Sequence, residues 1–252
     1  MNIHLHFVGG FGACPEKAGL GSPCESLGVG YSASRLPGHP VSLERSDDAQ
    51  ERFKAKVLAQ CTATDWVNRV ADDFRNLNQR EDVDRIILAG HSMGAHLISA
   101  ALKQVQTDTE LQKLAGITMI STPIEGELNK GYSYFLKLAA TSEIRFIGGI
   151  PYPTLGGPGS NKYVVPKGVK QFLLAMRMGT ASLPNVSVPV LLFNFREDPS
   201  VQAGSAYTIL GYLPDEIREK SKKIILEGPR RHTPNEEDKK IIVEETLRFH
   251  VA

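Results

Sequence analysis

The sequence has little cysteine and no long hydrophobic run. Its only cysteines are Cys14, Cys24 and Cys61, an odd number at spacings that match no metal motif. We interpret them as reduced thiols of a cytoplasmic protein, with a Cys14–Cys24 disulfide as the less favoured alternative. No apolar stretch approaches the roughly 18 residues that span a bilayer. The opening MNIHLHFVGG lacks the basic segment and the long apolar core of a signal peptide. We therefore expect no integral membrane association.

The chain also lacks an excess of charge of either sign. Its net charge is +1, and the basic residues form no long run. A nucleic-acid partner is therefore not expected. His4 and His6 alternate on one face of a predicted strand, but no carboxylate or cysteine stands at a matching spacing. We interpret both as packing residues and predict no metal and no cofactor.

Short apolar runs alternate with helical patterns along most of the 252 residues. Helices are predicted from Asp65, with Thr64 or Asp65 as N-cap, and over 93–105, 205–213 and the segment from about Asn235. This alternation predicts an α/β fold in which helices cover both faces of a mostly parallel sheet. The predicted strands are residues 3–8, 28–34, 85–90, 116–121, 188–195 and 222–228.

The alternation is lost between about Pro123 and Asn185. This stretch is rich in aromatic residues, and its part 145–166 is dense in glycine and proline. A segment of this length is commonly a lid or a binding element. A small subdomain whose aromatic side chains only pack on each other is an equally weighted and compatible alternative. We predict a core of residues 1–122 and 186–252 with a cap insertion at 123–185.

A candidate nucleophile lies where the third predicted strand meets a helix. The motif Gly90-His91-Ser92-Met93-Gly94 follows the strand RIIL and precedes GAHLISAAL. A sharp strand-to-helix turn holds such a serine in strained geometry and lifts its hydroxyl clear of the sheet, and glycine two positions away on each side avoids collisions. The motif alone is a weak signal, and a turn without chemistry is its structural alternative.

A serine hydroxyl needs a base, normally a histidine that a carboxylate orients. Glu197 and Asp198 follow the fifth predicted strand, and His232 follows the sixth. His250 lies in the last predicted helix and is too late in the chain for a loop after a strand. Taken alone, Asp198 has a plain explanation as a turn residue and His232 as a solvated loop residue. Together they occupy strand ends, where open α/β sheets build their sites.

An oxyanion hole requires backbone N–H donors beside the nucleophile. Met93 supplies one because it directly follows Ser92. The glycine-rich segment after the first strand supplies a candidate for the other, the N–H of Phe11, with Gly9 and Gly10 allowing close approach of the backbone. A simple glycine turn is the alternative.

At this point the chain resembles the α/β-hydrolases, in particular small carboxylesterases and monoacylglycerol lipases. The resemblance covers 1–122 and 186–252 and is weak over the insertion, which stands where this family has its cap. It favours Asp198 over Glu197 as the acid. The matching segments besides the serine motif are Gly9-Gly10-Phe11, RLPGHP (35–40), TATDWVNRVADDF (62–74), EDPSV (197–201) and HTP (232–234).

The chain departs from the family pattern in three places. Gly9 replaces the usual histidine of the oxyanion motif, and no glycine directly precedes His232. The sequence begins at the oxyanion strand, which implies a sheet of about six strands rather than eight. We interpret His91 and His96 as structural and the pair Arg230-Arg231 as solvated.

The resemblance implies a serine hydrolase of carboxylic esters that acts through an acyl-enzyme on Ser92. Its substrate would be a small ester with an apolar acyl group, either a short-to-medium acyl ester or a monoacylglycerol. Thioester or amide hydrolysis and acyl transfer use the same groups and remain open. A non-catalytic binding protein of the same fold is the alternative from another class. The expected assembly is a monomer or a dimer.

Overall fold

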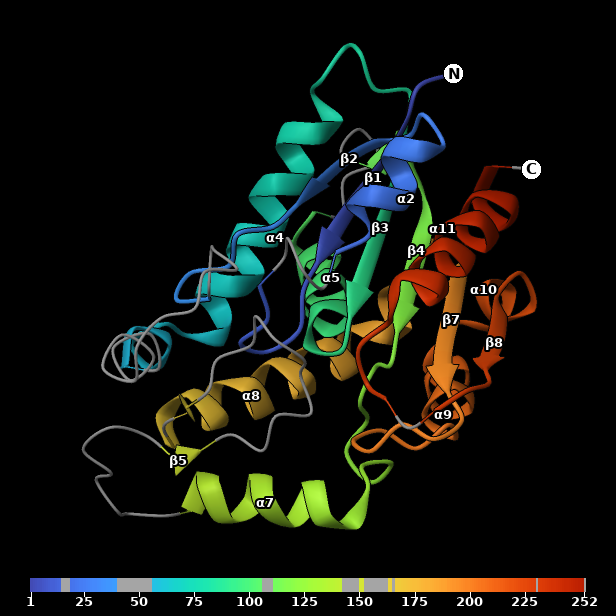
Figure 1. The fold of residues 1–252 in the computed structure, drawn as a ribbon. Helices are drawn as coiled ribbons and strands as arrows, with labels where there is room; N and C mark the ends of the chain where they lie inside the picture. Colours follow the sequence, from blue (N-terminus) through green and yellow to red (C-terminus); the bar gives the residue numbers. More distant parts are fainter. Residues whose placement is uncertain are drawn as a thin grey trace.

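A six-stranded sheet forms the centre of the computed structural model (Figure 1). The structure describes residues 1–14, 19–39, 56–105, 111–141, 150–151, 163–164, 166–229 and 231–251. All neighbouring strands of this sheet pair in parallel, which confirms the predicted fold class and sheet size. In spatial order the strands are β2 (Gly30–Ala33), β1 (Ile3–Val8), β3 (Arg85–His91), β4 (Leu114–Ile120), β7 (Val190–Phe195) and β8 (Lys222–Leu226).

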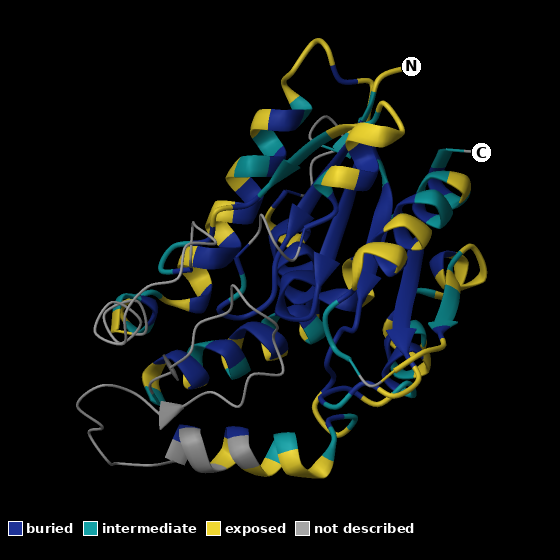
Figure 2. Cartoon of the chain, viewed as in Figure 1, coloured by how far each residue is buried: buried dark blue, intermediate teal, exposed yellow. Residues whose placement is uncertain are grey.

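The central strands are apolar along nearly their whole length because helices cover both faces of the sheet (Figure 2). One face packs against α4 (Ala63–Asn78), α5 (Met93–Gln104) and α9 (Ser205–Tyr212), and α8 (Pro166–Ser182) packs in turn on α4 and α5. The fully buried rings of Trp66, Phe74 and Phe172 belong to this core. The other face packs against α2 (Gly21–Ser26) and α11 (Glu236–Val251), around Phe7 and Phe193. The short helices α10 (Asp215–Glu219) and η1 (Leu183–Asn185) complete this part of the chain.

Helix α4 begins earlier than the sequence predicted. Its N-cap is Thr62, not Thr64 or Asp65. The Thr62 hydroxyl accepts from the Asp65 N–H at 3.2 Å, and the Asp65 carboxylate accepts from the Thr62 N–H at 2.8 Å. This reciprocal capping box satisfies two backbone donors, so the helix starts where the box closes. Asp65 is therefore the third helical residue and not the cap.

The insertion contains more regular structure than the sequence indicated. It holds α7 (Lys130–Thr141), the paired strands β5 (Ile150–Pro151) and β6 (Tyr163–Val164), and α8. Helix α8 packs tightly on α5, since a Cβ on Gly179 would lie 2.3 Å from the His96 Cβ. In Figure 1, α7 and α8 lie across the end of the sheet toward which the strand arrows point. The division into a core and a cap stays a prediction, and most of the segment 145–166 lies outside the described residues.

Two histidines of β1 belong to a buried polar chain that joins β1, β2 and α4. Ser34 Oγ donates to Asp73 Oδ2 at 2.8 Å, so it accepts from His6 Nε2 at 2.9 Å. His6 Nδ1 then accepts from Ser32 Oγ at 2.7 Å, and Ser32 accepts from His4 Nε2 at 2.8 Å. Every donor in the chain thus points toward the Asp73 carboxylate. His4 and His6 therefore hold the edge strand β2, as expected for packing residues.

We predict that the folded state loses stability as the pH falls below 6.5. Burial lowers the pKa of six of the seven histidines, to about 3 for His6 and about 4 for His96. Between these values and 6.5 the unfolded chain binds protons that the folded chain excludes. Each such histidine therefore removes up to about 1.4 kcal/mol of the free energy of unfolding per pH unit of acidification. The other four histidines with a lowered pKa are His4, His39, His91 and His250.

Urea unfolding at pH 6.5, 6.0, 5.5 and 5.0 measures this loss. His96→Gln removes one titrating group, so its free energy of unfolding should fall less steeply with pH than that of the unaltered protein. A free energy of unfolding that stays constant over this range would contradict the prediction.

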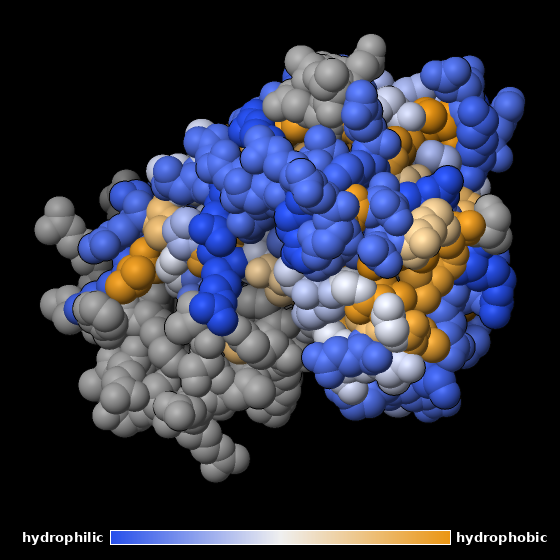
Figure 3. Space-filling model, turned by 90° about the horizontal axis from the view of Figure 1, so that it is seen from above, coloured by the Kyte–Doolittle hydropathy of each residue, from blue (hydrophilic) through white to orange (hydrophobic). Residues whose placement is uncertain are grey.

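The face that carries both chain termini is mainly hydrophilic, with an apolar area toward the right of the view (Figure 3). This face lies at the N-terminal ends of the strands (Figure 1). Within the described residues, no helix has the length and the apolar character needed to cross a membrane. The candidate site described next lies at the opposite end of the strands.

Candidate active site

Ser92 occupies a strained turn between β3 and α5. Its backbone has φ 54° and ψ −121°, a left-handed conformation that costs a residue with a side chain of the order of 1–3 kcal/mol. Ser92 N–H donates to the Ile120 carbonyl of the neighbouring strand at 2.8 Å, which ties the turn to the sheet. The turn predicted from the motif is therefore present, and Met93 is the first residue of α5.

The two glycines of the motif are required by contacts with neighbouring backbone. A Cβ on Gly90 would lie 2.5 Å from the N and Cα atoms of Ala95, in the first turn of α5. A Cβ on Gly94 would lie 2.0 Å from the Val8 carbonyl oxygen at the end of β1. The closest of these contacts are therefore with Ala95 and Val8 and not with the serine itself. The glycines instead allow β1, β3 and α5 to approach closely where the serine is presented.

Asp198 and His232 form a buried pair. Their Oδ2 and Nδ1 atoms are 2.8 Å apart, and the Asp198 side chain has no exposed surface. The other carboxylate oxygen accepts from the N–H groups of Ser200 at 2.7 Å and Val201 at 3.0 Å. Burial alone would raise the pKa of Asp198, but the charge and hydrogen bond of His232 and these two N–H groups hold it below its usual value. Glu197 is exposed and makes no such pair in the described part of the chain.

The start of the insertion supports the acid loop. Asn129 donates from Nδ2 to the Asp198 carbonyl at 2.7 Å, and its backbone N–H donates to the Ser200 carbonyl at 3.0 Å. Leu128 and Val201 also form an antiparallel bridge. No sequence pattern pointed to Asn129, because its partner is a backbone carbonyl 69 residues away.

The loop that carries His232 is anchored on α11. Arg231 pairs with Asp238 at 2.6 Å, with only 17% of the Arg231 side chain exposed, and its guanidinium lies over the Phe195 ring. The expectation that Arg231 is solvated was wrong, because the acidic first turn of α11 offers it a buried partner. Arg230 lies outside the described residues. These contacts fix the chain directly beside His232.

The glycine-rich loop after β1 lies directly against the nucleophile turn. A Cβ on Gly10 would lie 3.1 Å from the Ser92 Cβ. The Phe11 ring packs among Trp66, Phe172 and His39, which fixes the loop from the side of α4 and α8. Gly9 precedes this contact at the end of β1. The roles of the Phe11 and Met93 N–H groups as oxyanion donors stay predictions.

The structure brings Ser92, Asp198, His232 and the glycine-rich loop to one end of the sheet. Not every pair that the proposed chemistry requires is joined by a hydrogen bond. His232 lies beside the nucleophile turn, since its carbonyl oxygen is 3.0 Å from Nε2 of His91, the residue before Ser92. No hydrogen bond joins Ser92 to His232 among the described residues. Hydrogen bonds of catalytic groups are often long before substrate binds and tighten in the complex.

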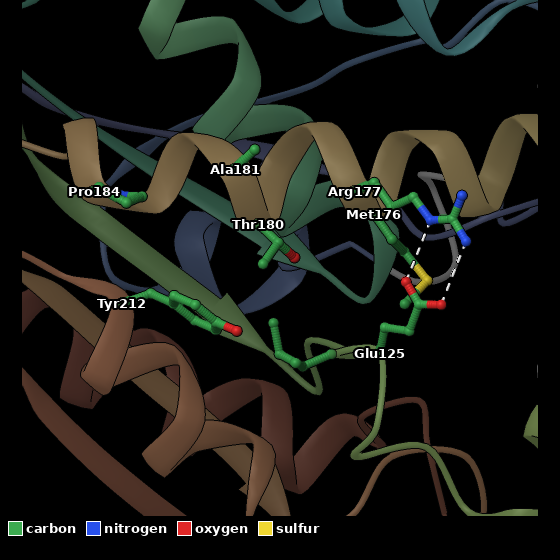
Figure 4. A pocket seen from close by; sticks show the side chains of 8 residues that line it. Glu125, Met176, Arg177, Thr180, Ala181, Pro184 and Tyr212 are labelled. Atoms are coloured by element: carbon green, nitrogen blue, oxygen red, sulfur yellow. Dashed lines mark hydrogen bonds and ion pairs between the residues drawn. The ribbon is translucent and has the colours of Figure 1, made fainter.

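A pocket with a volume of about 360 Å³ opens between α8 and α9 (Figure 4). Arg177 pairs with Glu125 at one rim through bonds of 3.2 and 3.3 Å, and the Tyr212 hydroxyl faces the interior. Ser92, Asp198 and His232 are not among its lining residues, so this pocket is separate from the candidate triad. It is lined by Ile124, Glu125, Met176, Arg177, Thr180, Ala181, Pro184 and Tyr212.

Comparison with known proteins gives matches at the level of structure only. No family model and no curated protein matches the sequence. A solved structure reported for LipS and LipT, two metagenome-derived lipolytic enzymes, superposes with a TM-score of 0.70 at 22% identity, covering 98% of this chain and 93% of the other. The monoacylglycerol lipase of Paleococcus ferrophilus gives a TM-score of 0.66 at 18% identity, covering 98% and 94% of the two chains.

A lipase-esterase related protein from Clostridium acetobutylicum matches with a TM-score of 0.62 at 18% identity, covering 98% of this chain and 94% of that protein. These likenesses span nearly the whole of each chain, so they concern the complete arrangement of sheet and helices. Together with the six-stranded parallel sheet and the strand–turn–helix at Ser92, they show that the chain has the α/β-hydrolase fold.

Proposed function

We propose that this protein is a serine hydrolase of carboxylic esters. The observation that carries the proposal is the buried Asp198–His232 pair beside a strained serine turn at the ends of the strands. A carboxylate that binds His232 Nδ1 leaves Nε2 available as a base. The lipolytic enzymes and the monoacylglycerol lipase among the structural matches agree with this chemistry.

The reaction proceeds in two halves. Ser92 Oγ attacks the acyl carbonyl carbon while His232 Nε2 takes the hydroxyl proton, and the N–H groups of Phe11 and Met93 bind the oxyanion. The C–O bond to the alcohol then breaks, and His232 returns the proton to the leaving oxygen. Water then attacks the acyl-enzyme while His232 takes one of its protons. The bond between the acyl carbon and Ser92 Oγ breaks, His232 returns the proton to Ser92 Oγ, and a carboxylic acid leaves. Asp198 holds the imidazole and stabilises its charged form.

We further propose an ester of a short-to-medium apolar acyl group, or a monoacylglycerol, as the substrate. Helix α8 of the insertion reaches the oxyanion loop, because the Phe172 and Phe11 ring centroids are 5.2 Å apart. A Cβ on Gly168 would also lie 3.6 Å from the Phe11 ring. The insertion therefore places apolar side chains against the oxyanion loop, and we propose that an acyl chain gains binding energy by burial next to them.

We predict that kcat/KM for p-nitrophenyl esters rises from acetyl to butyryl or hexanoyl and falls again by palmitoyl. Each buried methylene contributes roughly 0.8 kcal/mol, so two methylenes raise kcat/KM by up to about 15-fold. The common leaving group keeps the chemistry constant across the series. An enzyme that hydrolyses the acetyl ester fastest would contradict the acyl pocket and leave the triad in place. Failure to hydrolyse any ester above the uncatalysed rate would overturn the proposed function.

A further inference from the structure

His91 connects three parts of the candidate site. It ends β3 directly before Ser92 and is only 3% exposed. Its Nε2 lies 3.0 Å from the carbonyl oxygen of His232, and the two ring centroids are 4.9 Å apart. On its other side, a Cβ on Gly10 would lie 3.3 Å from His91 Nδ1. The ring thus sits between the nucleophile turn, the oxyanion loop and the loop of the proposed base.

The hydrogen bond defines the tautomer of His91. A carbonyl oxygen only accepts, so Nε2 carries the proton and donates it. Nδ1 is then a bare acceptor, and it is buried without a hydrogen-bond partner among the described residues. Burial and, to a smaller extent, the neighbouring His232 lower the pKa of His91 to about 3. The hydrogen bond to the His232 carbonyl raises the pKa but does not offset these effects. His91 therefore stays neutral and places no positive charge beside His232 when His232 takes a proton.

We propose that His91 is a positioning residue that holds the main chain of His232 in register with Ser92. The inference rests on the proposed function and goes beyond the purely structural role assigned from the sequence. Asp198 fixes the imidazole of His232 through Nδ1, and Arg231 anchors the preceding residue on α11, but neither contact holds the backbone of His232 itself. The His91 donor adds a second attachment, at the carbonyl of the same residue. Because His91 and Ser92 are adjacent in the chain, this hydrogen bond fixes the position of His232 relative to the nucleophile.

The test compares three variants in hydrolysis of p-nitrophenyl butyrate. His91→Phe keeps a ring but removes the N–H donor. We expect kcat to fall about 10- to 100-fold, because a misplacement of a catalytic group by about 1 Å reduces the rate by this order. KM should stay within about twofold. His91→Gln places an N–H donor near the position of Nε2 and should recover most of kcat. His96→Phe is the matched control.

His96 is a buried, neutral histidine in the adjacent helix whose Nε2 donates to the Pro123 carbonyl at 2.5 Å, away from His232. Its loss should lower the thermal midpoint as much as His91→Phe does, with kcat unchanged. Equal losses of kcat in the two Phe variants would assign His91 a structural role only. Full kcat in a folded His91→Phe variant would overturn the proposal outright.

A second readout separates this inference from the proposed function. The His232 Nδ1 proton, bonded to Asp198, should give a low-field proton NMR resonance in the unaltered protein. In His91→Phe this resonance should broaden or shift, and in His96→Phe it should not. If the unaltered protein hydrolyses no ester but the resonance responds as stated, the proposed function fails and the positional coupling stands. If ester hydrolysis is normal and neither the resonance nor kcat changes in His91→Phe, the coupling fails and the function stands.

Discussion

Ser92→Ala is expected to reduce kcat/KM for p-nitrophenyl butyrate by at least about 10³-fold, because the loss of a triad member typically costs several orders of magnitude. The variant removes the oxygen that forms the acyl-enzyme. The same change should abolish labelling by a fluorophosphonate, which in the unaltered protein adds one phosphonyl group to Ser92. Intact mass spectrometry and peptide mapping measure the adduct.

The backbone strain at Ser92 offers a control that distinguishes lost chemistry from lost folding. Ser92→Gly also removes the nucleophile, yet glycine adopts φ 54° without the steric cost that a side chain pays there. Its thermal midpoint should equal or exceed that of the unaltered protein while its activity is lost. Ser99→Ala, in the same helix, removes a hydroxyl that donates to the Ala95 carbonyl and should keep its activity. Near-normal turnover by Ser92→Gly or Ser92→Ala would refute the assignment of the nucleophile. An unlabelled, inactive protein would favour a binding module.

Asp198→Asn is expected to lower kcat by about 10³- to 10⁴-fold, a loss typical of the acid member of a triad. The introduced amide can present an N–H to His232 Nδ1, which favours the tautomer that carries the proton on Nε2 and so blocks the base. The carboxylate also accepts from the Ser200 and Val201 N–H groups, so the variant weakens the acid loop as well. Stopped-flow or steady-state hydrolysis of p-nitrophenyl butyrate measures the loss.

Glu197→Gln provides the matched change one residue away. Glu197 is exposed, whereas the Asp198 side chain is fully buried against His232. The Gln variant should keep kcat within about twofold, because the side chain of Glu197 is exposed to solvent. A larger loss of kcat in Glu197→Gln than in Asp198→Asn would reassign the acid.

The sequence by itself determined the parts of this protein that depend on short-range patterns. Alternating apolar runs and helical periodicities predicted six strands and a sheet covered on both faces, because burial on both sides demands continuous apolar strands. The glycines around Ser92 predicted the sharp turn, because a turn between a strand and a helix that approach so closely needs them. His232 and the pair Glu197 and Asp198 were candidates because of their order along the chain and their places after strands, and the resemblance to the α/β-hydrolases favoured Asp198.

Only the tertiary structure decided what depends on residues far apart in the chain. Helix α8 was missed because its sequence lies among glycine and proline residues, which hide the helical pattern. Its apolar face becomes clear only when α8 packs on α5 in the fold. The solvated assignment of Arg231 failed because Asp238 and Phe195 approach it only in the fold. The hydrogen bond from His91 to the His232 carbonyl spans 141 residues and uses a backbone acceptor, which leaves no mark on side-chain identity. Local periodicity reflects which face of an element is buried, whereas the partner across that face is fixed only when the sheet and its loops come together.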